Sequence, residues 1–258
     1  MVVRNVGHMG RVLGNGLIAV CFGLLALVAL PSFAWGGVPC VDVNGDGVCD
    51  SGDITAEILD DGHFSTPHSI LIPSGVSLVV KDGTLSLSAG GKISLGSKAT
   101  LKAGLDVALT AGGDIVLGPN ATVQAKKDEF GSVFLTSENG NISLEDGSQV
   151  VARYGVSVEV LAGELTVSGA RVYSLTNYVD IFAGQNVTIN GSSLRAPGIL
   201  TVQSGGTLVE FSDNKVTVAA DGLVLLSALG GSTVNVCGTV FKKIDPANVL
   251  IDPEPDPC

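Results

Sequence analysis

Short runs of alternating apolar and polar residues recur along most of this chain, and each is followed by a turn of small residues. The runs that open successive units are 92–95, 114–117, 141–144, 164–167, 186–189, 208–211 and 233–236. The first apolar residues of these runs recur at intervals of roughly 20–27 residues, a period that short strands give in a solenoid. The repeats of such a fold pack on their neighbours. We therefore expect an all-β fold, a right-handed parallel β-helix of about seven coils over residues 70–243.

Alternate residues of each expected strand are aliphatic, as at 76–80, 107–109 and 156–160, whereas the intervening residues are mostly polar. Because successive strand residues point to opposite faces, we expect the aliphatic set to face inward and the polar set to face water. Glycine pairs at 90–91 and 112–113 lie where the coil must bend, and a residue without a side chain lets successive turns approach to sheet spacing. Aromatic residues make up only 5% of the chain, so the core must consist of Val, Leu, Ile and Ala.

The first 34 residues have the pattern of a secretory signal peptide. Arg4 and Arg11 precede an apolar stretch at 17–30, and Ser32 and Ala34 are small residues at the positions that a signal peptidase reads. A membrane anchor is the competing interpretation, but the apolar run is shorter than the ~20 residues of a membrane span. We predict four segments: a signal peptide 1–34, an N-terminal cap with a calcium loop 35–69, the β-solenoid 70–243 and a Pro-rich C-terminal tail or cap 244–258.

The charge of the chain favours some partners over others. It has 25 Asp and Glu against 14 Lys and Arg, a net charge of −11. Loss of the signal peptide removes two Arg and no acidic residue, which leaves 12 − 25 = −13. Nucleic acids require clustered Lys and Arg, so we expect none as a partner. We expect a secreted or cell-surface protein without a membrane span after cleavage, whose partners are glycans or cell-surface proteins and whose acidic groups suit divalent cations.

Four cysteines remain after the predicted cleavage: Cys40, Cys49, Cys237 and Cys258. An even number in an exported protein indicates disulfides, with three possible pairings. Proximity in the sequence favours Cys40 with Cys49 and Cys237 with Cys258. Each bond would close a short loop at one end of the array, where unpaired strand edges need protection.

Residues 42–53 carry oxygen-bearing groups at the spacing of a twelve-residue calcium loop. Carboxylate or amide side chains stand at loop positions 1, 3, 5, 9 and 12, and Gly47 occupies position 6, where the chain turns sharply. An Asx-rich turn that is merely acidic is the alternative, because Asp, Asn and Gly favour turns. We predict a weak Ca²⁺ site, with a Kd of roughly 10⁻⁴ to 10⁻³ M, that fixes the cap. Its ligands would be Asp42, Asn44, Asp46, the carbonyl of Val48, Asp50 and Asp53.

This loop, over about 40–53, resembles the calcium loops of dockerins and of thrombospondin type 3 repeats. The likeness lies in the opening Asp-Val-Asn-Gly-Asp-Gly and in Asp53, which replaces the usual bidentate Glu at position 12. The flanking Cys40 and Cys49 are closer to the thrombospondin-type repeats. A dockerin carries two such loops, and this chain shows no second one, so cohesin binding is not implied.

The repeats resemble those of filamentous haemagglutinin-type adhesins and other exported β-solenoids. The residues that carry the likeness are Gly-Asp-Ile-Val-Leu at 113–117, then Ala-Thr-Val at 121–123, with counterparts up to Val236. It covers about two thirds of the chain. The resemblance implies a parallel β-helix that acts at the cell surface, although the Asn-Pro-Asn-Gly secretion signature of two-partner adhesins is absent from the sequence.

Many parallel β-helices cleave polysaccharides, which requires clustered carboxylates and a basic residue. The three arginines Arg153, Arg171 and Arg195 fall at different offsets within their units and do not form one line, and the residues at 92, 114, 141, 164 and 186 form a solvated polar column. The other candidate acids are Asp128, Glu129, Glu145, Asp146, Asp180 and Asp213. His63 and His68 lack neighbours at metal-ligand spacing.

Two long units offer the best places for a binding surface. Lys126-Lys127-Asp128-Glu129-Phe130 is a charged bulge with an aromatic tip, and Tyr173 lies near Tyr178. A solvated loop is the simpler interpretation, but Phe130, Tyr173 and Tyr178 are the candidates for a glycan-stacking face. We expect an exported, non-catalytic, calcium-binding β-solenoid in adhesion or extracellular structure. The alternatives are a carbohydrate-active β-helix and a module that binds proteins through its sheet faces.

Overall fold

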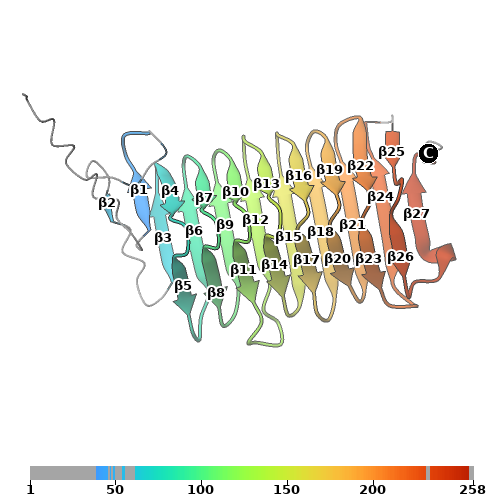
Figure 1. Cartoon of the computed structure of the whole chain (residues 1–258), viewed down its shortest axis with the longest axis horizontal. Coiled ribbons are helices and arrows are strands. Elements are labelled where there is room, and N and C mark those ends of the chain that lie inside the picture. Colours follow the sequence, from blue (N-terminus) through green and yellow to red (C-terminus); the bar gives the residue numbers. More distant parts are fainter. Residues whose placement is uncertain are drawn as a thin grey trace, which may run out of the picture. The chain divides into compact units, whose positions relative to one another are not determined.

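The computed structural model of the protein describes residues 39–45, 47, 49, 54–55, 62–230 and 233–255. These residues form an all-β solenoid, and the one helical segment among them is the single turn η1 (Pro246–Asn248). Strands stack coil upon coil into three sheets, which we name A, C and B. Each coil from β4 onward runs through them in that order (Figure 1). The predicted signal peptide lies outside the described residues.

Sheet A has ten strands, and eight of them are parallel members of the solenoid stack. In spatial order the strands are β2 (Ile54–Thr55), β1 (Cys40–Asp42), β4 (Ser69–Ile72), β7 (Ile93–Leu95), β10 (Ile115–Leu117), β13 (Ile142–Leu144), β16 (Leu165–Ser168), β19 (Val187–Asn190), β22 (Leu208–Ser212) and β25 (Thr233–Asn235). The first two pair antiparallel, β2 with β1 and β1 with β4. Strand β1 therefore covers the edge at which the parallel stack begins.

Sheets C and B complete each coil. Sheet C comprises β5 (Ser77–Val80), β8 (Thr100–Ala103), β11 (Thr122–Ala125), β14 (Gln149–Ala152), β17 (Arg171–Ser174), β20 (Ser193–Ala196), β23 (Lys215–Val218) and β26 (Val240–Lys242). Sheet B comprises β3 (His63–Thr66), β6 (Leu85–Ala89), β9 (Val107–Ala111), β12 (Val133–Ser137), β15 (Gly155–Val160), β18 (Tyr178–Ala183), β21 (Ile199–Ser204), β24 (Leu223–Ala228) and β27 (Val249–Asp252).

The described residues thus form eight coils, from β4–β5–β6 to β25–β26–β27. This confirms the predicted parallel β-solenoid, and the number of coils is close to the seven expected from the sequence. Strands of the stack also lie outside the predicted range 70–243. On one side β3 pairs with β6, and on the other β27 pairs with β24, so that the segment expected as a tail supplies the last strand of sheet B.

The core is a set of aliphatic columns that run through the stack. Ile115 pairs in register with Ile93 on one side and Ile142 on the other, and all three side chains are fully buried. Each such side chain contributes about 1.5–3 kcal/mol of hydrophobic free energy on burial. Phe211 is the largest side chain of the core. The alternation of inward aliphatic and outward polar residues agrees with the sequence prediction, because the pleat of a strand fixes that period at two.

Every coil turns from sheet A to sheet C through one residue in the left-handed conformation. The eight residues, with φ between 53° and 76°, are Gly75, Lys98, Asn120, Gly147, Gly169, Gly191, Asp213 and Gly238. Left-handed backbone costs an L-residue roughly 1–2 kcal/mol, and Gly adopts it freely. Five of these positions are Gly, and Asn and Asp, which tolerate this conformation better than most residues, occupy two of the others. The turn geometry therefore explains this column of glycines.

Candidate functional site

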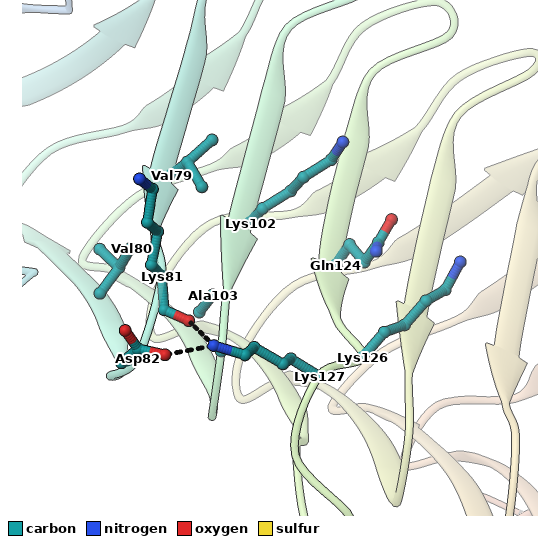
Figure 2. Close-up of a pocket in the computed structure, with 10 residues that line it drawn as sticks. Val79, Val80, Lys81, Asp82, Lys102, Ala103, Gln124, Lys126 and Lys127 are labelled. Atoms are coloured by element: carbon teal, nitrogen blue, oxygen red, sulfur yellow. Dashed lines mark hydrogen bonds and ion pairs between the residues drawn. The ribbon is translucent and has the colours of Figure 1, made fainter.

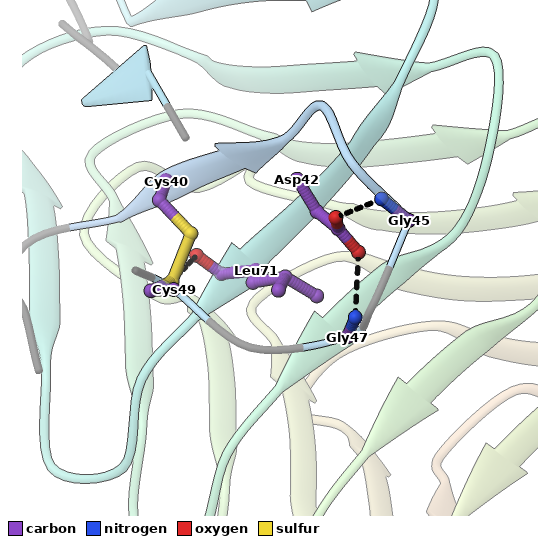
Figure 3. The surroundings of a disulfide bond; sticks show 6 residues. All are labelled: Cys40, Asp42, Gly45, Gly47, Cys49 and Leu71. Carbon is purple, nitrogen blue, oxygen red and sulfur yellow. Dashed lines mark hydrogen bonds between the residues drawn. A yellow bond between two sulfur atoms is a disulfide. The ribbon is translucent and has the colours of Figure 1, made fainter. Parts of the chain in front are cut away.

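The N-terminal cap places the first two predicted calcium ligands at the end of β1. The Asp42 carboxylate is only 5% exposed. One of its oxygens accepts a hydrogen bond from the Gly45 amide at 2.6 Å, and the other accepts one from the Gly47 amide at 2.9 Å (Figure 3). A carboxylate offers about four lone-pair sites, so each oxygen retains capacity for a further partner. Asn44, at loop position 3, lies on the exposed side of the same turn.

The sharp turn that the sequence places at loop position 6 is present. Gly45 and Gly47 have φ values of +79° and +80°, and a Cβ on either would meet open space. Backbone conformation alone therefore favours Gly at both positions. The remaining predicted ligands, Asp46, Val48, Asp50 and Asp53, lie outside the described residues. The parts of the chain that the structure does describe contain no group of three or more His, Cys, Asp or Glu arranged to hold a metal ion.

The structure confirms the predicted disulfide between Cys40 and Cys49, whose Cα atoms are 5.9 Å apart. That distance falls within the usual range for a disulfide. The disulfide joins the calcium-loop segment to β1, and Cys49 Sγ lies 3.9 Å from the carbonyl oxygen of Leu71 on β4, in the first coil (Figure 3). Cys237 is also disulfide-bonded, and its expected partner, Cys258, lies outside the described residues.

The predicted polar column lies at the corner between sheets B and A, where it forms a hydrogen-bonded ladder. Asp114 Oδ1 accepts from the Asn141 amide, and Asn141 Oδ1 accepts from the Glu164 amide, each at 2.8 Å. Asn186 Nδ2 then donates to Glu164 Oε1 at 3.1 Å. Ser69 Oγ begins the series by accepting from the Lys92 amide. The side chains of Ser69, Asp114, Asn141 and Glu164 thus each bind the next coil, which gives this column a structural role.

The structure distributes the other candidate carboxylates around the coil. Glu145, Asp146 and Asp213 lie at the corner between sheets A and C, close to the left-handed turn residues. Asp128 and Glu129 lie at the corner between sheets C and B, where Asp128 Oδ1 accepts from the Phe130 amide at 3.0 Å. Asp180 stands on β18 of sheet B. The sequence predicted that the three arginines would not form one row, and the structure agrees. Arg153 follows β14, Arg171 pairs with Ser193, and Arg195 pairs with Tyr173.

A row of three aromatic rings, of which two are exposed and one is half-buried, runs along the corner between sheets C and B. Phe130, 69% exposed, lies 6.0 Å from Tyr154 between ring centroids, and Tyr154 lies 5.9 Å from Tyr178 in an edge-to-face arrangement. We call these three residues the aromatic ridge. They come from three successive coils, and both spacings are those of favourable aromatic pairs. The bulge that the sequence indicated at 126–130 thus presents its aromatic tip to solvent, at one end of the ridge.

Carboxylates flank the ridge and affect the hydroxyl of Tyr178. Partial burial raises the pKa of the Tyr178 hydroxyl, and Tyr154 and the carboxylates of Asp180 and Asp106 raise it further. Burial also raises the pKa of the Asp180 carboxyl, with a second contribution from Glu159. Gly155, which pairs with Tyr178, carries no side chain, and a Cβ there would overlap the Tyr178 ring. The ring therefore lies across the backbone of the preceding coil.

Only two of the three aromatic residues proposed from the sequence belong to this ridge. Tyr173 lies on sheet C, where its hydroxyl donates to Ser193 Oγ at 2.9 Å. Tyr154 was missed because it has no aromatic neighbour in the sequence. The signal that identifies it is the coil period, since Phe130, Tyr154 and Tyr178 recur at equal intervals along the sequence, one coil apart.

Within the described residues no helix is long and apolar enough to span a membrane. The resemblances to filamentous haemagglutinin-type repeats and to dockerin-type loops remain predictions, whereas the parallel solenoid itself is shown by the strand register. Comparisons with family models, with curated proteins and with solved structures find no match to this chain.

Proposed function

We propose that the protein is exported and acts outside the cell, in adhesion or extracellular structure, as a non-catalytic solenoid that binds glycans through the aromatic ridge. The observation that carries this proposal is the regularly spaced row of Phe130, Tyr154 and Tyr178, in which Phe130 and Tyr154 are exposed and Tyr178 is half-buried. Large exposed aromatic rings are costly in water and are typical of binding surfaces. The signal-like segment 1–34 and the disulfides support export, because such bonds persist in oxidising compartments.

A sugar chain suits this surface for two reasons. Aromatic rings offer flat apolar faces on which the C–H face of a pyranose can stack, and the neighbouring carboxylates of Asp106 and Asp180 are acceptors for sugar hydroxyls. The ridge also rests on a rigid support, because the coil that carries each ring is hydrogen-bonded to one coil on either side. A preformed site lowers the entropic cost of binding.

Substitution of the central ring tests this proposal. A screen of immobilised uncharged glycans identifies a binder, and calorimetry then compares the unaltered protein with Tyr154→Ala, with Tyr173→Ala as the matched control on sheet C. We expect Tyr154→Ala to weaken binding roughly fivefold to tenfold, the loss of about 1 kcal/mol of ring contact, and Tyr173→Ala to leave it unchanged. Equal affinities for the three proteins, or no glycan bound, would contradict the proposal.

We further propose that Ca²⁺ binds the 42–53 loop and stabilises the cap. The Asp42 carboxylate is held by the Gly45 and Gly47 amides with acceptor capacity left over, which supports this assignment. Calorimetric titration of the unaltered protein should give one weak site, with a Kd of roughly 10⁻⁴ to 10⁻³ M. Asp46→Ala should abolish that site. Asp128→Ala, which removes a carboxylate from the bulge between β11 and β12, should retain it.

A carbohydrate-active enzyme is the second candidate, and one observation favours it. Burial and the nearby Glu159 raise the pKa of the Asp180 carboxyl, which lies next to the ridge, and glycoside cleavage uses a carboxyl group with a raised pKa together with a second carboxylate. Incubation with pectin and alginate, followed by an assay for new chain ends, separates the two functions. Release of ends that is lost in Asp180→Asn would establish the enzyme, and intact polysaccharide would support the non-catalytic scaffold.

A further inference from the structure

Sheet C presents a positively charged face on an acidic protein. Five exposed cationic side chains point outward from its strands: Lys102, Arg171, Arg195, Lys215 and Lys242. No Asp or Glu occurs in the eight strands of this sheet. Acidic residues outnumber basic ones by 25 to 14 in the whole chain, so this sheet reverses the balance of the protein. We call this outward face of sheet C the basic strip.

The N-terminal end of the basic strip has additional lysines beside it. Lys81, Lys126 and Lys127 lie at the adjoining corner, around a shallow cavity of about 290 Å³. Lys127 forms an ion pair with Asp82, but Lys102 and Lys126 form none with any residue that the structure describes. Figure 2 shows the side chains of Lys102, Gln124 and Lys126 extending side by side toward solvent. The charges of Lys102 and Lys126 are therefore available to a ligand.

The opposite end of the basic strip has a second cationic cavity. Arg195, Lys215 and Lys243 line it together with Tyr173, and its volume is about 300 Å³. From β8 to β26 the strip spans six inter-strand intervals, or about 29 Å at the usual sheet spacing. Cationic groups thus recur along the axis of the stack over the length of several monosaccharide units.

Acidic residues border the basic strip on both sides. Glu145, Asp146 and Asp213 occupy the corner toward sheet A, and Asp82 and Asp106 occupy the corner toward sheet B. A strand of four residues is about 13 Å long, so the positive surface is a narrow band. It is bordered by acidic residues toward sheet A and by both acidic and basic residues toward sheet B. One extended polymer chain fits along such a band, whereas a wider anionic body would also meet the acidic residues toward sheet A.

We propose that the basic strip binds a linear acidic polysaccharide, with its carboxylate or sulfate groups paired to the Lys and Arg side chains and its axis along the stack. Nucleic acid fits less well, because single strands are held by several stacking aromatics and the strip exposes only Tyr173, while a duplex, which is wider than the strip, would also meet Glu145, Asp146 and Asp213 toward sheet A. An anionic bilayer would meet the same three residues. The site is separate from the aromatic ridge and does not depend on it.

Binding to defined polymers tests the proposal. Calorimetry of the Tyr154→Ala variant, in which the aromatic ridge lacks its central ring, is run at low and at physiological salt with polygalacturonate and dextran sulfate as acidic probes and with unmodified dextran as the neutral one. We expect binding of at least one acidic probe, weakened by salt because exposed charge pairs are screened, and no binding of dextran. Equal binding of dextran, or salt-independent binding, would overturn the proposal, as would tighter binding of single-stranded DNA or of vesicles rich in phosphatidylserine.

Matched variants locate the site. Lys215→Gln and Lys92→Gln change the net charge by the same amount, but Lys92 belongs to the polar column at the opposite corner. We expect Lys215→Gln to weaken acidic-polymer binding about twofold to fivefold, the double change Arg195→Gln with Lys215→Gln roughly tenfold, and Lys92→Gln to have no effect. Circular dichroism confirms that each variant is folded. Equal losses in Lys92→Gln and Lys215→Gln would refute the location, and unaltered binding by Tyr154→Ala would show independence from the aromatic ridge.

Discussion

Two glycines of the left-handed column provide a controlled measurement of crowding in a solenoid turn. Gly169 and Gly191 occupy equivalent positions one coil apart, with φ values of +60° and +58°. A Cβ on Gly191 would have no atom within 4 Å, whereas a Cβ on Gly169 would overlap Asp146 Oδ1 and lie 3.1 Å from its Cγ. Substitution by Ala therefore imposes the same backbone strain at both positions and a steric conflict at only one.

The expected magnitudes follow from these two contributions. Left-handed backbone costs Ala about 1–2 kcal/mol, and the lower entropy of its unfolded chain returns about 0.4–1 kcal/mol, so Gly191→Ala should destabilise by roughly 0.5–1 kcal/mol. Gly169→Ala should cost a further ~1–2 kcal/mol, because the Asp146 side chain must leave its position. For a chain of this size 1 kcal/mol corresponds to about 2–4 °C in Tm.

Urea denaturation followed by circular dichroism measures both variants, alone and in an Asp146→Ala background. With the Asp146 carboxylate removed, Gly169→Ala should cost no more than Gly191→Ala, because the nearest remaining atom is the Asp146 Cα at 3.4 Å. The reasoning would be refuted by equal midpoints for the two single variants, or by an Asp146→Ala background that leaves their difference intact. Such results would mean that the turn relaxes without strain.

Three further predictions concern individual residues. Lys98 has a φ of +60°, and Lys98→Gly should raise the free energy of unfolding of the protein by about 0.5 kcal/mol, because the relief of backbone strain exceeds the entropic penalty of Gly. Thermal denaturation checks the sign. Cys49→Ser should lower the free energy of opening of β1 by about 2–3 kcal/mol, given a loop of 9 residues, and hydrogen exchange of the Val41 amide should accelerate accordingly. Asp180→Asn should raise Tm at neutral pH: burial and the nearby Glu159 raise the pKa of the Asp180 carboxyl in the folded state, which means that folding disfavours its ionised form, and Asn removes that charge. Its advantage should therefore disappear as the pH falls below the ordinary carboxyl range, and a constant advantage at all pH values would contradict this assignment.

The repeat architecture was predictable because one physical constraint, the burial of alternate residues, recurs in every coil. The columns around Ile93 and Ile115 follow directly from the period. The last strand of sheet B was not predicted, since Val249 and Ile251 lie beyond Pro246 in a segment whose prolines suggested an irregular tail. The structure accommodates that proline in η1 and then returns to the stack.

The surfaces were harder to predict, because they depend on which residues become neighbours between coils. Tyr173 and Tyr178 are close in the sequence yet lie on different sheets, whereas Tyr154 and Tyr178 are a whole coil apart in the sequence and in contact. The different offsets of the arginines exclude a single row but not a shared face. The outward face of a sheet C strand is two residues wide, and Arg171 and Arg195 occupy its two neighbouring rows. In both cases the three-sided cross-section of the coil was the missing information.

The in-register pairing of successive coils has a consequence for how such chains vary in length. Leu165 pairs with Val187 and Val172 pairs with Leu194, so that in both pairs the partner lies one coil further along the chain. Deletion of residues 165–186 would join Glu164 to Val187 and place the next coil on its new neighbour with the same inward residues. Gene duplication or loss of one such unit therefore changes the reach of the protein by a single strand spacing, ~4.8 Å, and leaves every other coil as it was. Length is a graded property of this molecule, adjustable one coil at a time.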